Sequence, residues 1–164
     1  MQVGSPANVF MIGGGEFGNP SMKSHRECRK LLKADSKSYV FQLRADMKYA
    51  RHGHSACGVG EKFIVVTAGR IGDGNTCEIY DVGLNKWQDL PKLNTKRHYH
   101  SSCAFENSSV FVFCGINCDN RQYVNTMERL DISMFHQNVI THWEVFTISG
   151  GLQDFTPRQG LGSC

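Results

Sequence analysis

Short apolar runs, each closed by small residues, recur along the chain. They occupy residues 8–14 (NVFMIGG), 63–69 (FIVVTAG) and 110–115 (VFVFCG). Runs of this length that are rich in β-branched and aromatic residues predict buried strands. The closing glycine predicts a sharp turn or a close backbone approach at the strand end. No long 3.6-residue pattern accompanies these runs, so they predict an all-β fold.

One segment is ambiguous between a helix and irregular structure. Residues 21–33 (SMKSHRECRKLLK) carry basic and apolar positions without a clear two-residue alternation. We expect this segment to be a short helix or a long loop that enters a strand, and we interpret it as an insertion between the second and third strands of the first unit.

A seven-residue pattern that begins with arginine and ends with cysteine occurs three times. It stands at residues 51–57 (RHGHSAC), 97–103 (RHYHSSC) and 158–164 (RQGLGSC), so the copies are 46 and 61 residues apart. A further strand in each unit is expected to end at an aspartate, whose carboxylate suits a turn. The repeat divides the chain into units of roughly four short strands at residues 1–50, 51–96 and 97–157, with residues 158–164 beginning another unit.

A period near 50 residues with four strands per unit is typical of a propeller blade. The middle unit, with Tyr80-Asp81, Trp87 and then an arginine and a His-Ser start, resembles the Kelch repeat family of β-propellers. The other units depart from it, because Phe41 replaces the tryptophan and Leu130 replaces the tyrosine. The resemblance implies a Kelch-type β-propeller of about three four-stranded blades in an incomplete ring.

An incomplete ring would leave apolar faces and strand edges uncovered at its two ends. We therefore expect the chain to be part of a longer protein or of an assembly. Two copies of three blades closing a six-bladed ring is one alternative. A chain that is an excerpt of a longer protein is the interpretation we favour at this point.

Composition narrows the classes of partner. The chain has 164 residues and a net charge of +3, which is too mild to indicate nucleic-acid binding. No apolar run approaches the roughly 20 residues that span a bilayer, so we expect no membrane partner. The seven cysteines are an odd number, which favours reduced thiols and a cytoplasmic location over a disulfide framework.

Five arginines are candidates for a partner-binding rim. Arg51, Arg97 and Arg158 recur at the start of each repeat, while Arg70 and Arg121 fall in expected loops. In Kelch proteins the loops of one rim form the partner surface, so the resemblance implies binding of an acidic or extended peptide by these residues. Guanidinium groups pair with carboxylates through two hydrogen bonds. The alternative is that the recurring arginines brace the blades through backbone carbonyls.

Three other kinds of site are alternatives to a peptide-binding rim. Gly13, Gly15 and Gly18 match G-x-G-x-x-G, which would indicate a nucleotide-binding oxidoreductase only if a helix followed. The histidines and cysteines at the repeat starts could ligate zinc, but their recurrence at one blade position favours a structural role. A propeller-type oxidase would need a copper site that no residues here match. We therefore expect a binding scaffold without catalysis, metal or cofactor.

Overall fold

The computed structural model describes residues 8–16, 23–70, 72–137 and 142–147. These residues form antiparallel sheets and include no α-helix. The all-β class predicted from the sequence is therefore confirmed. Among the described residues, no helix has the length and apolar character needed to cross a membrane.

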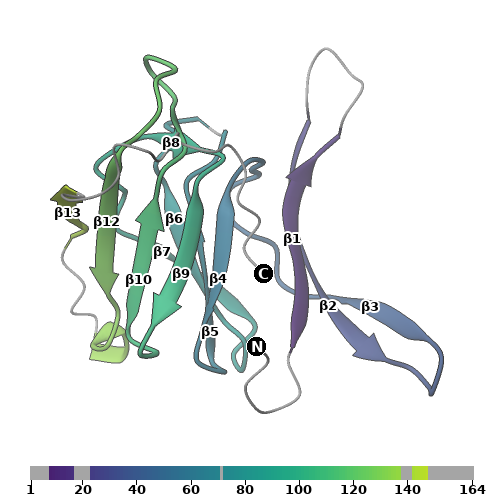
Figure 1. Cartoon of the computed structure of the whole chain (residues 1–164). Coiled ribbons are helices and arrows are strands. Elements are labelled where there is room, and N and C mark those ends of the chain that lie inside the picture. The colour runs from purple at the N-terminus through teal and green to yellow at the C-terminus, as the bar shows by residue number, and fades with distance from the viewer. Residues whose placement is uncertain (1–7, 17–22, 71, 138–141, 148–164) are drawn as a thin grey trace.

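Three sheets lie side by side in chain order, and we call them the first, second and third sheets (Figure 1). Each is built from antiparallel neighbours that follow one another along the chain. Their strands are β1 (Val9–Gly15), β2 (Ser24–Lys33) and β3 (Tyr39–Leu43); β4 (Ser55–Val59), β5 (Phe63–Thr67), β6 (Cys77–Asp81) and β7 (Lys86–Leu90); and β9 (Ser101–Phe105), β10 (Ser109–Phe113), β12 (Thr126–Asp131) and β13 (Glu144–Thr147).

Two smaller elements complete the fold. A ribbon of β8 (Arg97–His98) and β11 (Ile116–Asn117) lies above the third sheet in Figure 1. A short 3-10 helix, η1 (Phe135–Gln137), follows β12. The ribbon holds the start of the third repeat unit against the loop that leaves β10.

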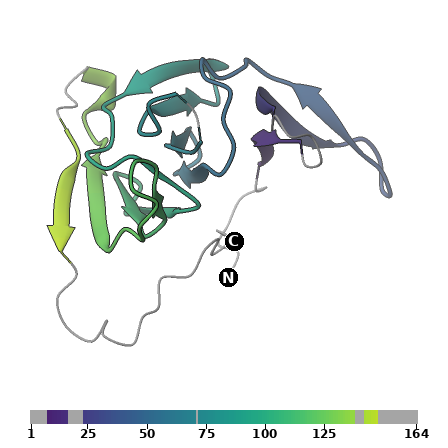
Figure 2. The same ribbon diagram turned by 90° about the horizontal axis from the view of Figure 1, so that it is seen from above.

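The second sheet is covered on both faces, which explains why β5 is apolar at nearly every position. Phe63 and Val65 contribute to a core shared with the third sheet, whereas Ile64 and Val66 contribute to a core shared with the first sheet. Side chains alternate across a strand, so a strand between two sheets needs apolar residues on both faces. Figure 2 shows the second sheet between the other two.

The glycines that follow β5 and β10 allow the segments that contain His52 and His100 to approach the backbone closely. A Cβ at Gly69 would lie 2.9 Å from the carbonyl oxygen of His52, and one at Gly115 would lie 2.8 Å from the Cβ of His100. Both glycines also have positive φ angles, which disfavour a side chain. The recurring small-Gly pair therefore has a steric cause.

The expectation for residues 21–33 is wrong. Residues 24–33 form β2, which pairs with β1 on one edge and with β3 on the other. Two hydrogen-bonded neighbours satisfy the backbone of this segment, whatever its local pattern suggests. The segment is therefore the middle strand of the first sheet and not an insertion.

The glycine-rich run forms the end of β1 and is not followed by a helix among the described residues. β1 ends at Gly15, and β2 is the next element among the described residues. Gly18 lies outside them. A dinucleotide site would need a helix N-terminus after the strand, with backbone amides facing the pyrophosphate. Here β1 and β2 pair antiparallel instead.

Candidate functional site

Two of the five predicted rim arginines are buried inside the sheets. Arg51 and Arg97 each have 0% exposure. Arg51 donates through Nη1 to the carbonyl oxygens of Ala68 and Thr76, both at 2.8 Å. A guanidinium that is fully buried in this way cannot meet a partner. The prediction that these two arginines belong to a binding rim is wrong, and the alternative of a structural brace describes them.

Each buried arginine has a buried glutamate as its counter-ion. Nη2 of Arg51 lies 2.6 Å from Oε2 of Glu78, and Nη2 of Arg97 lies 2.7 Å from Oε1 of Glu128. The glutamates occupy matching positions, because Glu78 pairs with Val66 on β5 and Glu128 pairs with Val112 on β10. Arg97 also donates hydrogen bonds through Nη1 to the carbonyl oxygens of Cys114 and Thr126.

The two glutamates also hold the segments that enter their sheets. Glu78 accepts from the backbone amide of Lys48 at 2.7 Å, and Glu128 accepts from those of Asn94 and Thr95 at 2.7 and 3.1 Å. Neither glutamate is among the residues predicted from the sequence. The available signal was a glutamate three residues before the closing aspartate of a strand in two copies, in CEIYD and MERLD.

The other two predicted rim arginines among the described residues line one cavity. Arg70 and Arg121 line a cavity of about 450 Å³ together with His98, Ile116 and Cys118. Arg70 follows the second sheet's small-Gly pair, and Arg121 belongs to the loop after β11. Both are exposed residues. The fifth candidate, Arg158, lies outside the described residues.

Local hydrogen bonds position the two loops. The amide of Arg70 donates to the carbonyl oxygen of His52 at 2.7 Å. The amide of Arg121 donates to the carbonyl oxygen of Asn117 at 3.0 Å, and the Asn117 side chain accepts from the amide of Asp119 at 2.8 Å. An asparagine that closes a turn in this way fixes a tight loop. Each arginine therefore projects from an ordered backbone.

The other polar groups of the cavity are electrically neutral at neutral pH. Burial, with the nearby Arg70 charge, lowers the pKa of His98, so its imidazole is uncharged. Burial, with Asp119, raises the pKa of Cys118, so its thiol stays protonated. The Cys118 sulfur lies 3.5 Å from Nδ1 of His98. The arginines thus supply the positive charge of the cavity lining.

This lining is suited to binding an anion. Two guanidinium groups in one cavity offer paired donors that match carboxylate oxygens. A protonated thiol is a poor nucleophile, because the thiolate is the reactive form. Within the described residues, no group of three or more His, Cys, Asp and Glu side chains could hold a metal ion. The six described cysteines are free thiols.

The histidines at the repeat starts join neighbouring sheets. Nε2 of His54, in the second sheet's unit, lies 3.1 Å from the carbonyl oxygen of Ile12 in the first sheet. Nε2 of His100, in the third sheet's unit, lies 2.8 Å from Oγ1 of Thr67 in the second sheet. The expected structural role of these histidines is therefore seen in both copies.

Burial of these two histidines predicts an acid-sensitive fold. Burial, with the nearby Arg51 charge, lowers the pKa of His54 to about 4; burial, with Arg97, lowers that of His100 to about 3. Their contribution to stability is complete above the unfolded-state pKa near 6.5. It falls with decreasing pH, because only the unfolded chain takes up protons. Each histidine should lower the free energy of unfolding by up to about 1.4 kcal/mol per pH unit below its unfolded-state pKa.

Urea unfolding measured at several pH values between 7.5 and 5 tests this expectation. The free energy of unfolding should decrease as the pH is lowered. A variant with both His54 and His100 replaced by glutamine should show a shallower dependence. A free energy that is flat from pH 7.5 to pH 5 in the unmodified chain would contradict the burial of neutral imidazoles.

The recurring aspartates close turns, as predicted. Oδ1 of Asp35 accepts from the amide of Ser38 at 2.9 Å, and Oδ1 of Asp81 accepts from that of Leu84 at 2.8 Å. Asp131 accepts from the amide of Ser133 at 2.8 Å. These three carboxylates stabilise the ends of the strands and lie outside the cavity lining.

Comparison with known proteins adds no family assignment: no protein-family model matches the chain, and no curated protein matches it.

Proposed function

We propose that this chain forms part of a Kelch-type β-propeller and acts as a protein-interaction scaffold. It would hold an acidic, extended peptide on the loop rim that carries Arg70 and Arg121. The observation that carries this proposal is the convergence of these two exposed arginines in one cavity, from loops 51 positions apart in the sequence. The proposal includes no catalysis, and it places the protein in the cytoplasm.

The propeller part of the proposal is supported by how the sheets repeat. Consecutive sheets pack against one another, and equivalent arginine–glutamate pairs recur in the second and third. Their inner strands are also joined, because the hydroxyl of Ser102 on β9 donates to that of Ser55 on β4 at 2.8 Å. Radial repetition of four-stranded sheets around inner strands is the propeller architecture.

The ligand class follows from the charge and shape of the cavity. Two guanidinium groups favour carboxylates, while Ile116 and neutral His98 add apolar surface and a hydrogen-bonding ring. The nearby Asp119 does not cancel this preference, because its carboxylate pairs with Lys96 at 3.0 Å. An extended peptide would point alternate side chains at the rim, so acidic residues at every second position suit it.

Fluorescence anisotropy can test this with a labelled peptide that alternates glycine and glutamate. We expect binding that weakens with salt, and a loss of about tenfold or more in affinity for either Arg70→Ala or Arg121→Ala. Arg26→Ala is the matched control, because Arg26 is exposed, pairs with Asp46 and does not line the cavity. The proposal fails if the glutamine version of the peptide binds equally well, or if Arg26→Ala weakens binding as much as the rim variants.

A further inference from the structure

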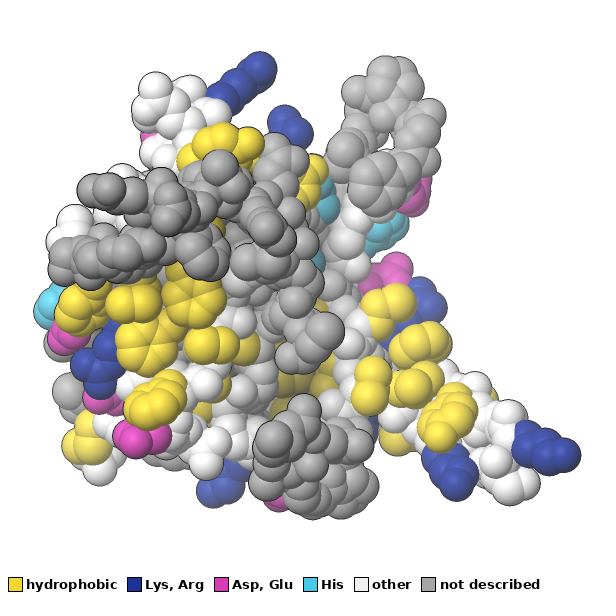
Figure 3. All heavy atoms as spheres, in the orientation of Figure 1, with side chains coloured by type: hydrophobic (Ala, Val, Ile, Leu, Met, Phe, Trp, Pro, Cys, Tyr) yellow, Lys and Arg dark blue, Asp and Glu magenta, His cyan; other side chains and the backbone are white. Residues whose placement is uncertain are grey.

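Within the part of the chain that the structure describes, two apolar sheet faces have no sheet packed on them, one at each end of the row of sheets. On the first sheet, Phe41 is 51% exposed and Leu43 is 69% exposed. On the third sheet, Phe105 is 56% exposed, and its ring packs edge-on against that of Phe111. Apolar side chains gather over both sheets in Figure 3. Contiguous exposed apolar surface of this kind marks an interaction site.

The strand register shows which side of its sheet each uncovered face occupies. We call the face that packs on the preceding sheet the leading face, and the opposite one the trailing face. In the second sheet, Ile64 and Val66 lie on the leading face, and Phe63 and Val65 lie on the trailing face. In the third sheet, Val110 and Val112 lie on the leading face. Phe10 and Ile12 lie on the trailing face of the first sheet, which packs against the second sheet. Val9 and Met11 therefore belong to its uncovered leading face.

Strand partners complete both uncovered faces. Residues directly opposite each other in a sheet point to the same side. Across the first sheet, Val9 pairs with Leu31 and Leu31 pairs with Phe41, which places Phe41 on the leading face. On the third sheet, Val110 and Val112 lie on the leading face, so the residues that alternate with them lie on the trailing face. The trailing face carries Phe105, Phe111, Phe113, Met127 and Phe146.

Equivalent residues in the covered interfaces show what these faces lack. Trp87 and Trp143 lie on leading faces, and their Nε1 atoms donate to the preceding segment, at the carbonyl oxygens of Ala45 and Pro91. Trp143 is 2% exposed, whereas Phe41, at the corresponding place in the first sheet, has no such cover. Similarly, Cys57 is partly buried under the third sheet, whereas its counterpart Cys103 is exposed.

The two described repeat cysteines therefore differ in burial although they recur at one position of the repeat. Cys57 and Cys103 occupy the same place in their strands, opposite Val65 and Phe111 respectively. Their exposure differs because a following sheet covers the trailing face of the second sheet only. The difference arises from packing between sheets and not from the local sequence.

We infer that a second copy of this chain covers both faces. The trailing face of the third sheet in one copy would pack on the leading face of the first sheet in the other, as consecutive sheets pack within the chain. Such a contact joins different surfaces, and it closes a ring when the rotation allows. Two copies of the three described sheets give six sheets, within the usual range of roughly four to eight for a propeller, whereas three copies would give nine.

Charges on the two faces are complementary. Lys33 lies on the leading face of the first sheet, opposite Tyr39. On the trailing face of the third sheet, Asp131 and Glu144 flank Arg129 and outnumber it. An excess of positive charge on one face and of negative charge on the other favours pairing of unlike faces over like faces. The inference rests on the stacking of the sheets and is independent of peptide binding at the rim.

Sedimentation velocity on the full chain provides the test. The unmodified chain should sediment as a dimer of twice 18.4 kDa. Leu43→Glu on the leading face and Phe111→Glu on the trailing face should each weaken the dimer by about 100-fold or more, because a charge would be buried unpaired at each joint. Leu84→Glu is the matched control. Leu84 is 74% exposed in the β6–β7 turn, and this variant should remain dimeric.

Mixing the two face variants distinguishes unlike from like pairing. A Leu43→Glu chain keeps its trailing face and a Phe111→Glu chain keeps its leading face, so an equimolar mixture should recover a heterodimer with one intact joint. Circular dichroism should show unchanged β-structure in every variant. The inference is overturned if the unmodified chain is monomeric at concentrations up to about 100 μM, if it forms open polymers, or if only one face variant loses dimerisation.

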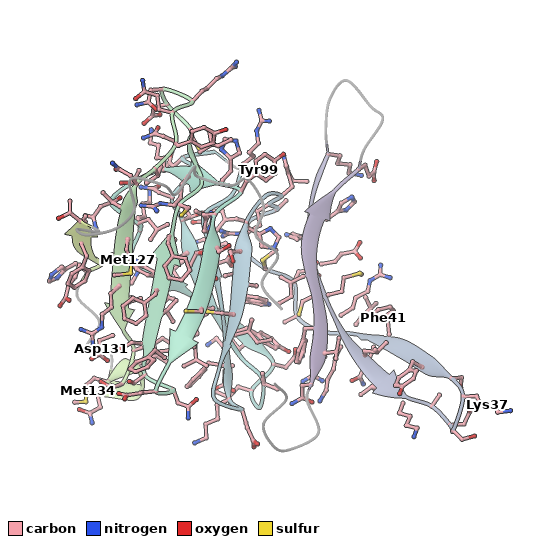
Figure 4. All side chains as sticks on the ribbon, in the orientation of Figure 1. Lys37, Phe41, Tyr99, Met127, Asp131 and Met134 are labelled. Atoms are coloured by element: carbon pink, nitrogen blue, oxygen red, sulfur yellow. The ribbon has the colours of Figure 1, made fainter. Side chains whose placement is uncertain are left out.

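Figure 4 shows Phe41 and Met127 on the first and third sheets, at opposite ends of the row of sheets.

Discussion

Replacing Arg97 with alanine is expected to lower the free energy of unfolding by about 3–5 kcal/mol, because Glu128 would be left as an unpaired buried charge. Both side chains of this ion pair are 0% exposed. The variant would also remove the donors to the carbonyl oxygens of Cys114 and Thr126. Urea unfolding followed by far-ultraviolet circular dichroism measures the change, with all variants at one protein concentration.

Arg121→Ala is the control for that experiment. Arg121 is exposed and lines the cavity that Arg70 also lines, so this variant should change stability by no more than about 0.5 kcal/mol. The two arginines are thus expected to separate stability from binding: Arg97 should affect the fold, and Arg121 should affect affinity for the acidic peptide. An Arg97→Ala variant as stable as the unmodified chain would rule out the brace.

Replacing Trp143 with alanine is expected to cost about 3–5 kcal/mol of stability, because a large buried side chain would leave a cavity. The Trp143 ring belongs to the core between the second and third sheets. Its Nε1 also donates to the carbonyl oxygen of Pro91 at 2.8 Å, which fixes the segment that enters the third sheet. Circular dichroism in urea suits this measurement, since the variant changes the tryptophan fluorescence.

Two further variants separate the contributions of Trp143. Trp143→Phe keeps much of the apolar volume and removes the hydrogen bond, so it should cost less than the alanine variant. Trp87→Ala should also cost less, because Trp87 is only partly buried against the core of the first and second sheets. Equal losses for Trp87→Ala and Trp143→Ala would contradict the difference in burial between the two sites.

Local patterns in the sequence were sufficient to predict the strands that carry most of the core. The apolar runs at residues 63–69 and 110–115 contain most of β5 and β10, and the aspartates that end β6 and β12 close turns. These features depend on interactions within a few residues. β2 was missed because it has no clear alternation, and its pairing with β1 and β3 alone defines it as a strand.

The candidate site depended on contacts between distant residues. The repeat placed Arg51 and Arg97 at equivalent positions, but their burial depends on Glu78 and Glu128, which lie 27 and 31 residues further along the chain. The meeting of Arg70 and Arg121 likewise requires the ribbon of β8 and β11 to hold two loops together. No local pattern distinguished a bracing arginine from an exposed one.

The sequence by itself determined the all-β class, the repeat and the turn residues, because alternation and turn chemistry act over short stretches of backbone. The tertiary structure decided which arginines are buried and which are exposed. It also decided which sheet faces are covered. The physical reason is that burial belongs to the packing of one sheet against the next, so identical positions in the repeat differ wherever a neighbouring sheet is present for one and absent for another.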